Sequence, residues 1–367
     1  MRRATKLFKV FGIDIQIHYS WWFVFILLTW SLSTAFFPHY FPEYKILEYW
    51  FMGVIASLLL FVSVLLHELS HSLVARARKI KVESITLFFF GGVAGITKED
   101  MKPSSEFMMA IAGPLFSFVL AGIFFLIFKL NGNGIVTAIT FYLYQLNLIL
   151  AIFNLVPGFP LDGGRAFRAI LYAYYKDLRK ATKIASMGGK FFAAMLIILG
   201  FYSLFSGVGG GLWFILLGGF LYFIAGVSYE QVVLREILAS VKINEILVKD
   251  YEMLDPEMKF KDFVKKYAKS GSPLFIVKGK DYEGVLDIRL IQKLPPKMQS
   301  VVSVKQLAFP IKDKDAVKID DSAYKAFRKL GALKTDILPV IKGKKLVGVI
   351  NQEAIMNRIA WELKFGK

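Results

Sequence analysis

The sequence predicts a polytopic α-helical membrane protein of about six spans, with short β segments near a polar site, followed by a soluble α+β domain. Three observations favour this fold class. Hydrophobic residues make up 56% of the 367 residues, and 35 residues are Phe, which exceeds the apolar share of ordinary soluble domains. Apolar runs close to the ~20 residues that cross a bilayer recur as far as residue 228. After Tyr229 the apolar runs shorten, and charged residues separate strand-like stretches.

The first predicted span begins with aromatic residues typical of a membrane interface, Tyr19, Trp21 and Trp22. No small-residue cleavage site follows its long apolar run, so we expect it to be retained as a span and not removed as a signal peptide. The predicted spans cover residues 18–37, 50–75, 106–129, 136–157, 191–206 and 212–228.

Positive charge predicts how these spans are oriented. Lys and Arg gather before the first span and after the second and fourth, whereas the opposite loops carry little beyond Lys45 and Lys129. The positive-inside rule therefore predicts a multi-pass protein of the cell membrane with both the N- and C-termini in the cytoplasm. The second and fourth spans then run in the same direction.

The net charge of +18 is explained by this distribution. No stacking pattern or helix-turn-helix accompanies it, so we expect the lipid bilayer as a partner and no nucleic acid. The chain has no Cys, which excludes thiol catalysis, thiolate metal ligands and disulfides.

The second span contains three ionisable residues, His67, Glu68 and His71, in an otherwise apolar run. A charged residue at a span centre costs roughly 2.5–3.5 kcal/mol, and a bound metal ion compensates for such residues. On a helix the two His lie one turn apart on the same face, the spacing at which two imidazoles bind one Zn²⁺. Glu68 is expected to act as a base toward water and not as a ligand. The pattern predicts one Zn²⁺ per chain and a metal-dependent hydrolase inside the membrane.

A catalytic zinc ion needs a third protein ligand, and the end of the fourth span supplies one. Pro157, Gly158 and Pro160 interrupt the helix there, and irregular backbone at membrane depth is tolerated only where it is buried in protein or lines a polar cavity. We expect this break to bring Asp162 to the site, on the same side of the membrane as the end of the second span.

Other acids and His residues are weaker candidates. Glu99, Asp100 and Glu106 are rival ligands, but they lie in a polar loop where solvated charge is the ordinary interpretation. His18 and His39 fall at an interface and in an outer loop, where we expect boundary residues.

These motifs resemble the site-2 protease family of intramembrane zinc metalloproteases. The resemblance covers about residues 1–228 and rests on H-E-x-x-H in the second span and on N-x-x-P-x-x-x-x-D-G beginning at Asn154; the pair Gly113-Pro114 also resembles a family feature. It implies that His67, His71 and Asp162 bind zinc, that Glu68 is the general base, and that Asn154 contacts the substrate or the developing oxyanion. Family members cleave membrane-spanning segments of other proteins, so the expected substrates are single-span membrane proteins.

Residues 82–96 are rich in β-branched and aromatic side chains and are too short between their glycines to form a span. A helical substrate has its scissile carbonyl hydrogen-bonded and shielded, so it must be unwound locally before cleavage. We expect this segment to form strands or a re-entrant hairpin whose free edge holds the substrate extended. The alternative is a buried connector that only packs.

The soluble part is expected to comprise a linker at residues 229–240 and a tandem domain at 241–367. Residues 274–287 correspond to residues 338–351, so the two copies fall near 241–300 and 301–367, and each reads as helix, strand, Gly turn, strand and helix. The repeat resembles paired cystathionine-β-synthase-type (CBS) modules, which in other proteins bind adenine nucleotides and regulate an attached enzyme or transporter. The acid that the resemblance leads us to expect in each copy is Leu290 in one and Ala354 in the other. Both an adenine-nucleotide site and a homodimerisation module therefore remain open.

Two other classes of protein share some of these features. A CAAX-processing membrane protease also carries H-E-x-x-H in a span, but its third ligand is normally a Glu, which the stretch around Asp162 argues against. A CBS-regulated transporter or channel would also combine a membrane domain with a cytoplasmic pair. The sequence shows no selectivity filter and no inverted repeat, so we expect regulated intramembrane proteolysis with modulation by the CBS-type pair.

Overall fold

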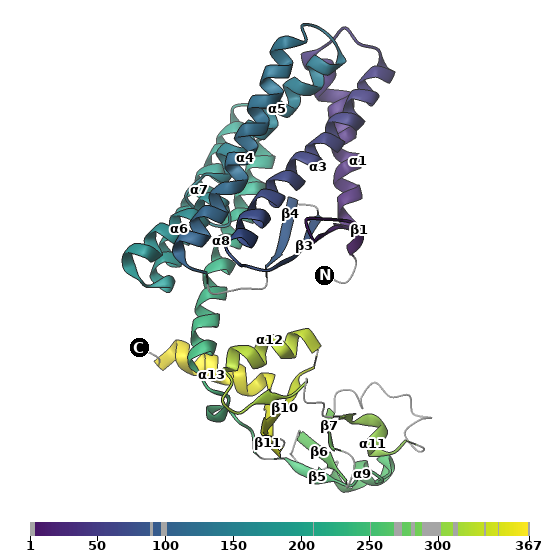
Figure 1. The fold of residues 1–367 in the computed structure, drawn as a ribbon, viewed down its shortest axis with the longest axis vertical. Coiled ribbons are helices and arrows are strands. Elements are labelled where there is room, and N and C mark those ends of the chain that lie inside the picture. The colour runs from purple at the N-terminus through teal and green to yellow at the C-terminus, as the bar shows by residue number, and fades with distance from the viewer. Residues whose placement is uncertain are drawn as a thin grey trace. The chain divides into compact units, whose positions relative to one another are not determined.

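A computed structural model of the chain divides into two compact units, residues 1–230 and 231–367 (Figure 1). The structure describes residues 4–88, 91–96, 101–207, 209–249, 251–267, 274–279, 283–287, 302–310, 315–333, 335–343 and 345–365. Residues 229–240, predicted as a linker, are helical and continue the last membrane helix. The limits predicted for the membrane domain and the tandem domain stay predictions.

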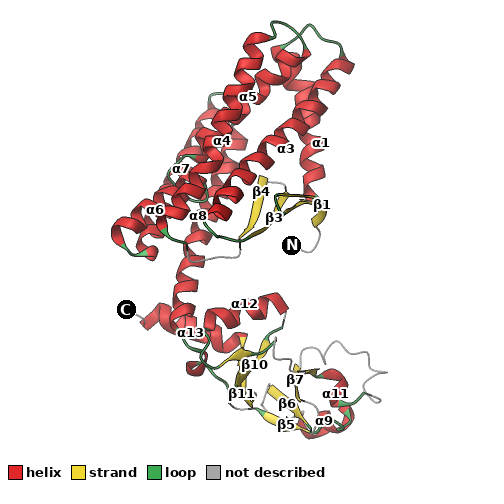
Figure 2. Cartoon of the chain, in the orientation of Figure 1, coloured by secondary structure: helices red, strands yellow, loops and turns green. Residues whose placement is uncertain are grey.

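The described part of the first unit has six helices that are long and apolar enough to cross a membrane, which confirms the predicted spans (Figure 2). The first is built from α1 (Ser20–Ser31), a π-helical turn (Leu32–Phe36) and α2 (Phe37–Tyr40). The others are α3 (Ile46–Ala77), α4 (Pro103–Leu130), α5 (Ile135–Asn154), α7 (Leu178–Phe205) and α8 (Gly211–Ser240). A shorter amphipathic helix, α6 (Asp162–Tyr175), lies between α5 and α7 in the chain.

The last span extends to Ser240 and not only to 228, and two further span ends differ clearly from the prediction. The fourth span ends at Asn154 and not at 157, because Pro157 has no N–H to donate and its ring disfavours a preceding helical turn. The fifth begins at Leu178 and not at 191, since Lys residues break the apolar run there without breaking the helix. Asp177 caps this earlier start by accepting a hydrogen bond from the Lys180 N–H at 2.8 Å.

A four-stranded sheet packs against the end of α3. It comprises β1 (Ala4–Val10), β2 (Ile13–His18), β3 (Val82–Phe88) and β4 (Gly91–Ile96) in the order β1-β2-β3-β4. The two hairpins are antiparallel, and β2 joins them by pairing with β3 in parallel. Strands at Val82–Phe88 and Gly91–Ile96 confirm the predicted β structure of that segment, with Phe89 and Phe90 outside the described residues. The first two strands were not predicted from the sequence.

The core under this sheet connects it to the centre of the membrane unit. Ile13 and Ile15 of β2 and Ile85 of β3 are buried together with Leu69 of α3 and Met109 of α4. Leu69 lies between His67 and His71 in the chain, so the sheet and the polar turn of α3 are held against each other by one apolar cluster. This arrangement places β3 and β4 beside the predicted site.

The second unit contains two copies of one topology. The first copy has β5 (Glu252–Leu254), α9 (Phe260–Tyr267), β6 (Leu274–Lys278) and β7 (Glu283–Asp287), followed by α11 (Val304–Leu307) and β8 (Phe309–Pro310). The second has β9 (Val317–Lys318), α12 (Ala323–Leu333), β10 (Ile337–Lys342), β11 (Lys345–Asn351) and α13 (Gln352–Phe365). In both copies the first strand pairs in parallel with the second, which pairs antiparallel with the third. The internal repeat is therefore confirmed, and Leu290 lies outside the described residues.

Candidate metal centre

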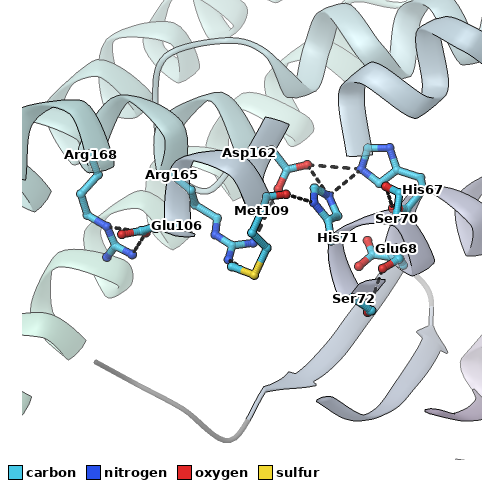
Figure 3. A network of polar contacts seen from close by, with 10 residues as sticks. All are labelled: His67, Glu68, Ser70, His71, Ser72, Glu106, Met109, Asp162, Arg165 and Arg168. Carbon is cyan, nitrogen blue, oxygen red and sulfur yellow. Dashed lines mark hydrogen bonds and ion pairs between the residues drawn. The ribbon is translucent and has the colours of Figure 1, made fainter. Parts of the chain in front are cut away.

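The structure brings His67, His71 and Asp162 together in the first unit (Figure 3). The Asp162 Oδ2 atom lies 3.2 Å from His67 Nε2 and 3.0 Å from His71 Nε2, and the two Nε2 atoms are 3.2 Å apart. Both imidazoles are buried, at 3% and 4% exposure. Three donor atoms from two helices thus face one point in the interior.

Helix α4 fixes the orientation of both imidazoles through contacts at Nδ1, whereas the Nε2 atoms face the centre. His71 Nδ1 donates to the Met109 carbonyl oxygen at 2.6 Å, and His67 Nδ1 lies 2.9 Å from the Ser117 hydroxyl. A carbonyl oxygen only accepts hydrogen bonds, so the proton of a neutral His71 is on Nδ1 and its Nε2 presents a lone pair. Such outer hydrogen bonds are a usual feature of metal-binding His residues.

The donor set fits a zinc ion. In a neutral His71 the bare Nε2 faces the Asp162 carboxylate at 3.0 Å, so two lone pairs oppose each other in a buried place unless a cation lies between them. Ligand atoms about 2.0–2.1 Å from a tetrahedral Zn²⁺ lie roughly 3.3 Å from one another. The observed separations of 3.0–3.2 Å are close to that value. Two imidazoles and one carboxylate also leave the fourth position that a catalytic zinc ion requires.

Gly113 of α4 allows that helix to approach the donor atoms. A Cβ added at Gly113 would lie 2.6 Å from His67 Nε2 and closer still to His71 Nε2, where no side chain fits. The residue was noted in the sequence only as part of a Gly-Pro pair. Its role is visible in the structure as the space that a missing side chain leaves beside both imidazoles.

The break after α5 delivers Asp162 to the site through close backbone contacts. A Cβ at Gly164 would meet the backbone of Gly158, and one at Gly158 would meet the backbone of Gly189 on α7. The chain therefore turns tightly between α5 and α7 and places Asp162 at the first position of α6, where a carboxylate is favoured by the helix dipole. The Asp162 Oδ1 atom, on the side away from the imidazoles, lies 3.7 Å from Arg165 Nη1.

Glu68 is close to the three donors but is not one of them (Figure 3). Its side chain contacts the backbone of β4, since a Cβ at Gly92 would lie 2.9 Å from Glu68 Cδ and 3.2 Å from Oε1. Within the described sheet β4 is an edge strand that pairs only with β3. The carboxylate therefore lies close to the donor atoms and against the face of an edge strand.

Of the residues that the structure describes, none of the other candidates from the sequence is one of the three donors. Glu106 is buried and forms an ion pair with Arg168 of α6, whose Nε lies 3.0 Å from Glu106 Oε1, so this rival does not join the donor atoms; Glu99 and Asp100 lie outside the described residues. His18 contacts the Ser20 hydroxyl at 2.9 Å, and the His39 ring packs on Tyr40. Asn154, at the end of α5, makes no side-chain hydrogen bond within the described part of the chain.

Sequence reasoning missed the residues that support the centre. Ser117, the Met109 carbonyl and Arg165 orient the predicted donors but belong to no motif. A signal for Ser117 was present, because it lies one helical turn after Gly113 on the same face of α4 and is polar in an apolar span.

The chain is similar to known zinc metalloproteases. The model of peptidase family M50 matches residues 55–142 and 129–199. A zinc metalloprotease from Methanocaldococcus jannaschii is 32% identical over 366 residues, 98% of this chain and 97% of that protein. Rip3 from Mycobacterium tuberculosis, named as a presumed zinc metalloprotease, is 32% identical over 320 residues, 85% of this chain and 81% of that protein.

Solved structures are similar to parts of the chain. The site-2 protease from Methanocaldococcus jannaschii is 33% identical, with a TM-score of 0.43 over 62% of this chain and 95% of that chain. The CBS domain of a bacterial CNNM/CorC family Mg²⁺ transporter is 14% identical, with a TM-score of 0.31 over 38% of this chain and 84% of that chain.

Proposed function

Since the chain belongs to peptidase family M50, the family of the site-2 proteases, we propose that His67, His71 and Asp162 hold its zinc ion and that Glu68 is the general base. The protein is an intramembrane zinc metalloprotease, an enzyme and not the transporter or channel that the sequence left as an alternative. The observation that carries the assignment of residues is the convergence of three donor atoms with His71 Nδ1 donating to a carbonyl.

The chemistry divides between the ion and the side chains around it. When bound, zinc supplies Lewis acidity that lowers the pKa of water toward roughly 7. Glu68 accepts the proton of the attacking water and passes it to the amine of the leaving fragment. Ser117 and the Met109 carbonyl keep the two imidazoles facing the centre during the reaction. Asn154 donates its amide N–H to the substrate carbonyl or to the oxyanion that develops from it.

The edge of β4 is the proposed binding site for the substrate backbone. A membrane-spanning substrate must be extended before its scissile carbonyl is accessible, and an open strand edge provides the hydrogen bonds that stabilise an extended segment. The contact of β4 with Glu68 supports this placement, because a peptide added to β4 then lies beside the base. The substrates are single-span membrane proteins, and their cleavage is regulated intramembrane proteolysis.

Cleavage of a single-span substrate by the purified full-length protein tests the assignment. Glu68→Gln is expected to abolish cleavage while zinc remains stoichiometric, whereas removal of both imidazoles is expected to remove the zinc. A chelator should stop the unaltered enzyme, and zinc should restore it. Stoichiometric zinc in a variant lacking His67 and His71 would refute the ligand assignment.

Proline substitutions test the strand edge separately. Because Pro cannot donate to a strand ladder, replacements at Gly92 or Ile96 should impair cleavage and leave zinc content unchanged. Crosslinking of a substrate trapped by the Glu68→Gln variant should map to β4. Normal turnover in both Pro variants would favour the connector interpretation.

The topology of the spans belongs to the same proposal. With Lys and Arg concentrated before α1 and after α3, both termini lie in the cytoplasm. Protease protection of tags at the two ends of the chain in sealed vesicles measures this. Opposite protection of the two ends would contradict it.

The second unit is proposed to regulate the protease by binding an adenine nucleotide. A cavity of about 430 Å³ opens between α12 and the start of β10, of a size that suits small ligands. The cavity is lined by one cation, one carboxylate and two polar side chains, from Arg328, Asp336, Thr335 and Gln352. Titration of the full-length protein with ATP or AMP should shift its thermal unfolding; no shift with either nucleotide would contradict the proposal. Homodimerisation through the repeats is measured by the mass of the detergent-solubilised particle.

A further inference from the structure

We propose that the hairpin formed by β1 and β2 is an anchor that inserts into an anionic lipid surface at the end of α1. None of the seven residues of β1 is buried, and the strand is an edge of its sheet. Leu7 and Phe8 are 52% and 48% exposed, and Phe11 in the turn is 65% exposed. An apolar edge strand exposed to water is prone to aggregation. We therefore expect these side chains to contact a surface other than water.

The turn between the two strands also indicates a contact outside the hairpin. Phe11 has a φ of 47° and Gly12 a φ of 75°, the left-handed region that two-residue hairpin turns require and that Asn, Asp and Gly occupy at low cost. A bulky aromatic residue is unusual in that region. The backbone conformation of the turn therefore disfavours Phe at position 11. A contact of the exposed Phe11 ring outside the hairpin explains why Phe stands there.

The position of the hairpin indicates that the surface in contact with these side chains is lipid. β2 ends at His18 and α1 begins at Ser20, so the hairpin lies at one end of a membrane span (Figure 1). Trp22 and Phe23 near the start of that span are 58% and 61% exposed, as expected of side chains that face lipid. The hairpin and the adjoining start of α1 therefore both expose large apolar side chains.

Charge indicates which lipid headgroups suit the hairpin. Lys6 and Lys9, with side chains 54% and 57% exposed, flank Leu7 and Phe8 and share one acid, Asp14. Arg76 of α3 lies against the turn, since a Cβ at Gly12 would lie 3.5 Å from its guanidinium. Apolar side chains interleaved with a net positive charge are typical of segments that bind anionic membrane surfaces.

The anchor has a consequence for the site. Ile13 and Ile15 of β2 are buried against α3 and α4, so the hairpin cannot move independently of the sheet. The opposite edge of that sheet is β4, which contacts Glu68. This step rests on the proposed function: lipid binding at β1 fixes the depth at which β4 presents a substrate.

Single-cysteine variants test the anchor directly, because the chain has no Cys of its own. A fluorophore attached to Phe8→Cys, in the full-length protein reconstituted into vesicles with equal parts of phosphatidylcholine and phosphatidylglycerol, should be quenched by lipids that carry a quencher below the headgroup. It should also be shielded from aqueous iodide. Phe11→Cys provides a second, independent label at the turn.

Two control positions calibrate the result. Ile26→Cys on α1, where the native residue is 64% exposed, should report lipid, and Met253→Cys in the second unit, 62% exposed, should report water. Adding Lys9→Gln should weaken the lipid quenching of the Phe8→Cys label in the anionic vesicles, because one surface charge is lost, and should change little in phosphatidylcholine alone.

Three results would overturn the proposal. The first is iodide accessibility at Phe8 equal to that at Met253 without quenching by lipid. The second is protection that grows with the ratio of protein to lipid, which would identify a second copy of the chain as the surface in contact with these side chains. The third is insertion that is identical in anionic and neutral vesicles. Label depth is read without any cleavage assay, so this test and that of the proposed function fail independently.

Discussion

Replacing Gly113 by Ala should remove most of the zinc affinity of the membrane unit. The added Cβ would lie 2.6 Å from His67 Nε2, whereas ordinary van der Waals contact begins at 3.4 Å, so that imidazole or α4 must move by about 0.8 Å. The displacement at His71 is larger. Metal sites tolerate deviations of only about 0.2 Å in ligand distance.

Neither side of this contact can move freely. Both imidazoles are held through Nδ1 by α4 itself, at Ser117 and at the Met109 carbonyl. Moving α4 away would pull both hydrogen bonds with it, and moving the imidazoles alone would break them. Loss of an outer hydrogen bond typically weakens metal binding 10–100-fold, so we expect a loss of at least about 100-fold when both are disturbed.

Zinc affinity is measured by competition with a chromophoric chelator on the purified full-length protein. Gly122→Ala is the matched control, because it makes the same substitution on the same helix at a position with nothing within 4 Å of the added Cβ. It should bind zinc normally. Zinc affinity and cleavage that are normal in Gly113→Ala would refute the reasoning, because the geometry allows no relaxed position for the methyl group.

Three further substitutions test the surroundings of the site. Ser117→Ala removes the partner of His67 Nδ1 and should weaken zinc binding roughly 10–100-fold in the same chelator competition; unchanged affinity would show that the hydroxyl does not orient the ring. Arg168→Met leaves Glu106 buried without its cation and should destabilise the membrane unit by about 3–5 kcal/mol in thermal unfolding, with much of the loss recovered when Glu106 is also made apolar. Gly92→Ala presses a methyl group onto the Glu68 side chain and should lower kcat while zinc content stays normal; a lower zinc content would instead place the damage at the donors.

The spans and the donor atoms were predictable because both leave strong marks in a sequence. An apolar run of membrane length is rare by chance, and ionisable residues inside one need a partner. The exact ends of the helices were less predictable. An apolar run ends at a Lys, whereas helix α7 extends back through Lys183 and Lys180 to its cap at Asp177. The helix continues because backbone hydrogen bonds do not depend on the polarity of the side chain.

The strands before α1 could not be predicted for a different reason. β1 shows no clean alternation of apolar and polar residues, and its partner β2 alternates over only six residues. The pairing of β2 with β3 joins residues about seventy positions apart in the chain. Local pattern carries no information about such a pairing, which depends on the apolar cluster that Ile13, Ile15 and Ile85 form with α3.

In the site, the residues that bind the metal ion were predictable from the sequence, whereas the groups that orient them were not. Side chains that bind a metal ion must be of a few types at fixed spacing, so His67, His71 and Asp162 stand out in a single sequence. A group that only orients them can be a hydroxyl, a backbone carbonyl or an absent side chain, as at Ser117, Met109 and Gly113. All three belong to α4, a span that contributes no donor atom. Helix α4 is therefore the element on which the geometry of the centre depends most, and substitutions on its inner face should damage zinc binding more than those on its lipid-facing side.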